Sequence, residues 1–202
     1  SPMTTVGSSG RTKTMNGIPT GPGQYDGTTD RCQFLAPITM DPSNAQRLAA
    51  GTYRVFITTN GGALWSAIST DLTGNGSGSS GSTITAVAFS PSSAAVLYAG
   101  TSGTGASARI QVTTNTGGVW TNVTASPLPN RTVTRIVVDP SDAGRAWALY
   151  SGYDVNTPAT PGHVFLTTDF GASWTNRSGN LPDLPVNAGL INPLNSNHLV
   201  IG

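Results

Sequence analysis

Glutamate is absent from this sequence, and lysine occurs only once, at Lys13. Charged residues make up 9% of the chain, far below the roughly 25% that is typical of globular domains. Glu and Lys are strong helix formers, whereas the 25 glycines and 14 prolines favour turns and strand ends. The composition therefore argues against a helical protein and predicts an all-β fold.

A strong charge of either sign is also missing. The formal net charge is +1, which provides no broad electrostatic field for nucleic acid or for an anionic membrane. No apolar run approaches the ~18–20 residues needed to cross a bilayer, and no signal peptide is visible at the Ser1 end. We therefore expect no nucleic-acid partner and no membrane span.

Cysteine is nearly absent, because Cys32 is the single one. It is either a small buried apolar residue, a half-cystine whose partner lies outside this chain, or a reactive thiol. No neighbouring Cys or His points to a metal, so the sequence predicts neither a metal site nor a cofactor. Low charge, scarce lysine and loops rich in Ser and Thr favour an extracellular or cell-surface protein.

One short pattern occurs three times, in residues 58–65, 113–120 and 167–174. We name these three segments the Trp turns. Each begins with Thr, continues through Asn or Asp and Gly, and ends at Trp65, Trp120 or Trp174. The first two tryptophans are 55 residues apart and the last two are 54 apart. Turn residues between strand formers predict a tight turn joining two strands. Recurrence at this period indicates a repeat architecture.

The repeat divides the chain into units of four short strands each, with turn signals at regular spacing. Units of this kind are the blades of a β-propeller; a β-sandwich or β-solenoid is the competing arrangement. Residues 1–31 form an N-terminal connection or arm, and a partial propeller follows over 32–202. The expected blades are residues 33–70, 83–124, 132–177 and 186–202, which is about three and a half blades. We expect either a fragment of a larger ring or closure with another copy, because an open ring exposes strand edges.

The pattern Thr-x-Asp/Asn-x-Gly-x-x-Trp resembles the Asp box, or BNR repeat, of the sialidase superfamily. Similar units occur in xyloglucanase-type glycoside hydrolases, the sortilin ectodomain and a photosystem II assembly factor. Leu64 and Val119 depart from the Thr or Ser that the family favours before Trp. The resemblance implies turn-forming residues away from any active site, namely Asn60, Gly62, Trp65, Asn115, Gly117, Trp120, Asp169, Gly171 and Trp174.

Ligand-binding candidates lie on the opposite face, where the other connections run. Arg54, Arg109 and His163 each stand eleven residues before a repeat Trp. They form either a basic cluster for a carboxylate, sulfate or glycan hydroxyls, or simply solvated strand starts. Tyr53 and Tyr153 offer stacking surfaces for sugar rings, while Trp147 is expected in the core. The Gly-Ser-rich segment 74–82 is predicted to be a mobile loop on this face.

A catalytic site is not marked by any motif. The acids on this face are Asp26, Asp30, Asp71, Asp154 and Asp183, and a glycosidase needs two carboxylates about 5–10 Å apart. Asp154, Asp183 and Asp71 are the weak catalytic candidates. Resemblance to sialidases would require a Tyr nucleophile with a Glu partner, and this chain has no Glu.

Three functions remain open from the sequence. The first is a non-catalytic propeller segment that binds a glycan or a protein through the face opposite the Trp turns. The second is part of a sialidase- or xyloglucanase-like glycoside hydrolase whose other carboxylates lie outside this chain. The third is a structural propeller of an extracellular assembly.

Overall fold

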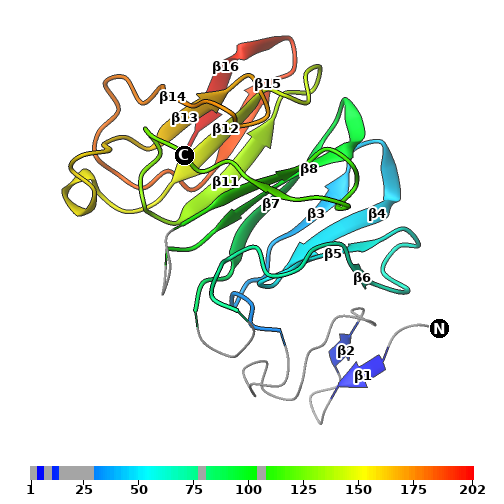
Figure 1. Ribbon diagram of the computed structural model, residues 1–202. Helices are drawn as coiled ribbons and strands as arrows, with labels where there is room; N and C mark the ends of the chain where they lie inside the picture. The colour runs from blue at the N-terminus through cyan, green and yellow to red at the C-terminus, as the bar shows by residue number, and fades with distance from the viewer. Residues whose placement is uncertain (1–3, 7–10, 14–29, 77–80, 104–107) are drawn as a thin grey trace.

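The computed structural model describes residues 4–6, 11–13, 30–76, 81–103 and 108–202. Three four-stranded antiparallel sheets follow one another along the chain and fan out around a shared centre (Figure 1). In each sheet, strands consecutive in sequence are neighbours. A two-stranded sheet begins a fourth blade. The chain is thus a partial β-propeller, which confirms the predicted fold class.

The strand bounds define the blades. Blade 1 contains β3 (Ile38–Asp41), β4 (Asn44–Gly51), β5 (Val55–Thr58) and β6 (Ser66–Ala67). Blade 2 contains β7 (Ile84–Ser90), β8 (Ser93–Thr101), β9 (Ile110–Thr113) and β10 (Thr121–Asn122). Blade 3 contains β11 (Val133–Val138), β12 (Ala146–Tyr150), β13 (Val164–Thr167) and β14 (Thr175–Asn176). Blade 4 has β15 (Gly189–Asn192) and β16 (Asn195–Ile201).

Two local features differ from the sequence expectation. The N-terminal arm contains a short hairpin, β1 (Thr4–Val6) and β2 (Arg11–Lys13), where no periodicity predicted strands. Residues 64–69, 119–124 and 173–177 predict fourth strands of five or six residues, but the fourth strand of each complete blade has only two residues. Outside the strands, one 3-10 turn, η1 (Asp154–Asn156), is the helical element of the described residues. Among those residues, no helix is long and apolar enough to cross a membrane.

The core consists of layers between neighbouring blades. Blades 1 and 2 enclose a cluster around Val55, Ile84 and Leu97, and blades 2 and 3 enclose the largest cluster. Trp147 and Leu149 of blade 3 pack against Val186 and Ile191 near or in blade 4. Trp147 therefore lies in an interblade core. Alternation along each strand sends one set of side chains toward each neighbouring blade, so the repeat can bury apolar surface only by stacking blades.

The Trp turns also fasten blades together. Nε1 of Trp120 donates a hydrogen bond to the carbonyl of Ile68 in the preceding blade, at 2.8 Å. Trp174 repeats this contact with the carbonyl of Val123, at 3.0 Å. A buried indole needs an acceptor for its N–H. Trp120 and Trp174 thus each join the start of their own fourth strand to the end of the fourth strand one blade earlier.

Close approach between blades 2 and 3 requires a glycine in β8. A Cβ on Gly100 would lie 2.4 Å from Cγ1 and 2.7 Å from Cβ of Val133. We expect Gly100→Ala to lower the free energy of unfolding by about 1–3 kcal/mol, because overpacking forces side chains or backbone to shift. Urea denaturation measures this. Gly103→Ala is the control, since its Cβ would meet nothing nearer than 3.7 Å; equal losses in the two variants would contradict the packing argument.

Candidate functional site

The two rims of the blades carry different chemistry. The turns between first and second strands lie beside the Trp turns: Gly61 donates its N–H to the carbonyl of Gln46, and Phe170 donates to Gly144. We name this side the turn rim. The connections between second and third strands and those between blades lie on the other side, which we name the loop face.

Hydrogen bonds hold each Trp turn in the same way. In the third copy, Gly171 N–H donates to Oγ1 of Thr167 at 2.8 Å, and that hydroxyl donates to Oδ1 of Asp169 at 2.8 Å. The N–H of Ser173 also donates to Oδ1 of Asp169, at 2.9 Å. The Ser173 hydroxyl bond to the second carboxylate oxygen is the first cause of a lowered Asp169 pKa. The carboxylate of Asp169 therefore stabilises the turn by accepting hydrogen bonds from within it.

The equivalent bonds recur at the other two Trp turns. Oδ1 of Asn60 accepts from the Thr58 hydroxyl and the Leu64 N–H, at 2.8 and 3.0 Å. Oδ1 of Asn115 accepts from Thr113 and Val119 at 2.9 and 2.8 Å. Leu64 and Val119 carry no hydroxyl, so the additional side-chain bond made by Ser173 is specific to the third copy.

The turn rim also holds two buried ion pairs. Nη1 of Arg47 lies 2.7 Å from Oδ2 of Asp41, and Nε of Arg145 lies 3.3 Å from Oδ2 of Asp139. Burial raises the pKa of Asp41, but hydrogen bonds from Ser43 and Arg47 outweigh burial and lower it. In both pairs the arginine stands six residues after the aspartate, at the start of the second strand. The pairs hold the first turn of blades 1 and 3.

Arg54, Arg109 and His163 occupy equivalent positions on the loop face. Their carbonyls accept hydrogen bonds from the N–H groups of Thr52, Thr101 and Tyr150 respectively. Their side chains have different neighbours. The Arg109 guanidinium lies against Gly74, where a Cβ would come within 2.4 Å of Nη2.

Arg54 forms an ion pair with Asp30. Its Nη2 and Nε bond the two carboxylate oxygens at 2.6 and 2.9 Å, and these bonds are the first cause of a raised Arg54 pKa. The Tyr53 ring lies against two guanidinium groups, with Arg31 at 4.6 Å and Arg54 at 5.3 Å from its centroid. The predicted stacking surface of Tyr53 is therefore already used by cations of the chain.

Asp71 belongs to the connection between blades 1 and 2. Burial raises its pKa, but hydrogen bonds from Thr73 and Gly76 and the charge of Arg31 lower it overall. Nη2 of Arg31 lies 3.7 Å from Oδ1 of Asp71. A carboxylate held in its ionised form by these contacts is a poor proton donor.

Two further acidic residues, Asp154 and Asp183, lie close to His163. Asp154 lies in η1 and Asp183 lies between β14 and β15, and their oxygens approach the buried Nε2 of His163 at 3.6 and 3.0 Å. Arg131 supplies the positive charge, with Nη2 at 3.2 Å from Oδ1 of Asp154. The backbone N–H of Asp154 is the first cause of a lowered Asp183 pKa. Among the described residues, Asp154, His163 and Asp183 are the group of side chains that could together bind a metal ion.

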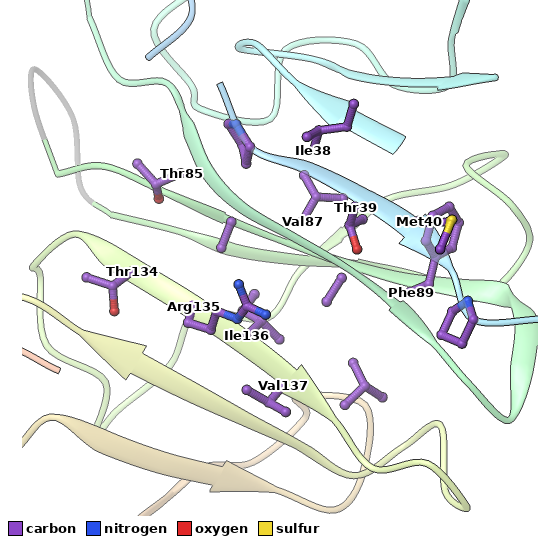
Figure 2. Close-up of a pocket in the computed structure, with 15 residues that line it drawn as sticks. Ile38, Thr39, Met40, Thr85, Val87, Phe89, Thr134, Arg135, Ile136 and Val137 are labelled. Atoms are coloured by element: carbon purple, nitrogen blue, oxygen red, sulfur yellow. The ribbon is translucent and has the colours of Figure 1, made fainter. Parts of the chain in front are cut away.

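A groove runs along the first strands of the three complete blades, as Figure 2 shows. Its volume is about 380 Å³, and its lining includes Met40, Phe89, Ile136 and the exposed Arg135. Arg135 forms no ion pair with any residue in the described ranges. This surface faces the centre of the fan.

A second hollow of about 400 Å³ adjoins this groove at the loop face. The two share Thr85 and Thr134. Hydroxyl and amide groups of Gln33, Thr132 and Asn187 complete the polar part of its wall, beside Phe34 and Leu35. The Phe34 ring is 84% exposed. Tyr153 is 46% exposed, on the loop that leads into η1.

Sequence reasoning missed Arg31, Arg131 and Phe34. Arg31 and Arg131 precede the first blade strand of their units, and their approach to Asp71 and Asp154 depends on folding. The strand-forming residues of 33–40 predict a strand that includes Phe34, but β3 begins only at Ile38, after Pro37. Cys32 is buried, and burial raises the pKa of its thiol. Asp26 and positions 77–80 of the predicted mobile loop lie outside the described residues.

Comparison with known proteins gives matches in structure alone. No family model and no curated protein matches the chain. An ancestral GH74 enzyme superposes with a TM-score of 0.56 at 19% identity, over 88% of this chain and 22% of that enzyme. The GH74 xyloglucanase from Xanthomonas campestris gives 0.55 at 14% identity, over 81% and 26%. The GH74 enzyme of Niastella koreensis gives 0.50 at 24% identity, over 68% and 21%.

This chain therefore spans about a quarter or less of the length of these structures. At such low identities the likeness concerns the backbone and carries no assignment of activity. Together with the three four-stranded sheets, it establishes that the chain folds as part of a β-propeller.

Proposed function

We propose that this chain is a non-catalytic segment of a β-propeller that binds a neutral glycan at the loop face. One observation carries the proposal: an exposed aromatic residue, Phe34, borders a largely apolar hollow whose lining also includes threonine, glutamine and asparagine side chains. Sugar rings present C–H faces to an aromatic ring and hydroxyls to such polar groups, so both halves of the hollow have a counterpart.

Among the residues that the structure describes, no charged one lines the hollow itself, which favours an uncharged ligand. Three arginines are paired elsewhere on the loop face. Arg54 is bonded to Asp30, Arg31 lies beside Asp71, and Arg131 lies beside Asp154. Cations that are already paired contribute little to the capture of an anionic ligand. An extracellular or cell-surface location, inferred from the low charge and the single lysine, is part of the same proposal.

A role within a glycoside hydrolase is the alternative. Asp154 and Asp183 do meet, with their ligand atoms within 4.8 Å of each other. This separation is at the short end of the range for catalytic carboxylates, and one of the two must act as an acid. The pKa of Asp183 is lowered, which is opposite to the shift that a general acid needs. In a hydrolase, Asp183 would therefore have to act as the base or nucleophile, with Asp154 as the acid.

Binding of neutral xyloglucan oligosaccharides, measured by isothermal titration calorimetry, tests the proposal. We expect Phe34→Ala to weaken binding about tenfold, which corresponds to about 1.4 kcal/mol of stacking contact. Leu194→Ala is the matched control, because Leu194 is 95% exposed but lies in the first turn of blade 4, on the turn rim.

Four outcomes would count against this reading. Equal weakening by the two variants would remove the site at Phe34. A preference for anionic polygalacturonate over xyloglucan would contradict the neutral ligand. Release of reducing ends from xyloglucan that is abolished in Asp183→Asn would establish the hydrolase alternative, and no binding to any glycan would favour a structural propeller.

A further inference from the structure

Folding brings three metal-ligand side chains together from separate parts of blade 3 and its exit. Asp154 begins η1, His163 directly precedes β13, and Asp183 lies in the connection from β14 to β15. Each offers one ligand atom, and these three atoms all lie within 4.8 Å of one another. The three positions are spread over residues 154–183, so no short sequence motif predicts the cluster.

The distances suit a small divalent ion. Zinc bonds nitrogen and carboxylate oxygen at about 2.0–2.2 Å in tetrahedral geometry, which places neighbouring ligand atoms about 3.4 Å apart. The Nε2 atom of His163 lies 3.0 Å from Oδ1 of Asp183 and 3.6 Å from Oδ1 of Asp154. Calcium and magnesium prefer all-oxygen sites. The imidazole therefore favours a transition-metal ion such as zinc.

The imidazole is held in place for such a contact. The His163 side chain is 2% exposed, and its Nδ1 lies 3.4 Å from the Tyr150 carbonyl and 3.4 Å from Nη1 of Arg131. Nε2 lies 3.0 Å from Oδ1 of Asp183, a distance at which an N–H on Nε2 can donate a hydrogen bond to that carboxylate. A zinc ion would take the place of this proton, because a metal-binding imidazole nitrogen must be unprotonated.

Backbone groups orient both carboxylates. Oδ1 of Asp154 accepts the Gly162 N–H at 2.7 Å, and Oδ1 of Asp183 accepts the Asp154 N–H at 2.8 Å. No described residue donates a hydrogen bond to Oδ2 of either aspartate. These oxygens remain available as ligands. Backbone hydrogen bonds of this kind hold metal-binding carboxylates in position.

The site is also open to solvent on one side. The Asp183 side chain is 46% exposed, whereas His163 forms the buried wall. The two carboxylates and the Arg131 guanidinium together carry a formal charge of −1. We propose that Asp154, His163 and Asp183 form a binding site for one divalent transition-metal ion of the zinc class, with water completing its coordination. Bound zinc would link η1 to the connection that leads into blade 4.

Zinc titration of the chelator-treated chain tests this inference, with calorimetry as the readout. We expect one zinc ion per chain, and we expect His163→Ala to weaken binding by about 100-fold, in line with the loss of a ligand or of its support. Asp183→Asn keeps the side-chain size and the acceptor for the Asp154 N–H, and should weaken binding at least about tenfold. This second variant covers the case in which His163→Ala fails to fold.

His198→Ala is the matched control, because His198 is the other histidine of the chain and is exposed on β16. Zinc affinity should be unchanged in this variant. Zinc should also raise the melting temperature of the wild type and of His198→Ala, but not that of Asp183→Asn. Absence of zinc binding, equal binding in His163→Ala and the wild type, or loss of binding in His198→Ala would overturn the site. None of these outcomes depends on whether glycans bind at Phe34.

Discussion

Trp174→Ala is expected to lower the free energy of unfolding by about 3–5 kcal/mol, the usual cost of deleting a large buried aromatic side chain. The Trp174 ring is 6% exposed and belongs to the cluster between blades 2 and 3. Its loss would leave a cavity at this interface and would remove the bond to the carbonyl of Val123. Urea denaturation followed by far-UV circular dichroism measures the change.

Trp174→Phe separates the ring from its N–H group. This variant keeps most of the apolar contact but leaves the Val123 carbonyl without its indole donor, so we expect a loss of about 1–2 kcal/mol. A loss below about 1 kcal/mol in Trp174→Ala would show that the interface does not depend on this ring. Equal losses in the two variants would assign the effect to the hydrogen bond alone.

Asp41→Ser is expected to cost about 3–5 kcal/mol, because it leaves the buried guanidinium of Arg47 without a counter-charge. The Asp41 side chain is 1% exposed and the Arg47 side chain is 9% exposed. Arg47 also lies 4.8 Å from the centroid of the Phe89 ring in blade 2. The unpaired charge would therefore remain at the interface between two blades. Chemical denaturation again provides the measurement.

The repeat itself supplies the control for this prediction. Blade 2 has Ser90 and Val96 at the positions of Asp41 and Arg47, with the same spacing and both buried. The double variant of Asp41→Ser with Arg47→Val should therefore recover most of the loss, to within about 1 kcal/mol of the wild type. If the double variant is as unstable as Asp41→Ser, the cost lies in the turn and not in the orphaned charge.

Repetition explains why so much of the fold could be predicted. Strand and turn residues recur at a fixed period, so the three copies of Thr, Asn or Asp, Gly and Trp each predicted a tight turn that joins two strands. The structure places three four-stranded sheets there. The fourth strands were predicted too long because residues near Trp65 and Trp120 pair over only two positions before the chain leaves for the next blade.

The candidate sites were less predictable because their partners are distant in sequence. Arg54, Arg109 and His163 were correctly placed at equivalent backbone positions, but their side-chain partners come from connections that do not repeat. Arg54 meets Asp30, 24 residues before it, and His163 meets Asp183, 20 residues after it. Periodicity carries no information about such pairs.

The sequence by itself determined the repeat, the all-β class and the chemistry of each turn, because these depend on local backbone preferences and on the period of apolar residues. Only the tertiary structure decided which charges are paired, that the Phe34 ring is exposed, and that Asp154 and Asp183 meet at His163. Those features depend on irregular loops brought together when the blades stack. Packing between blades fixes where each loop begins and ends, and so it decides which side chains meet.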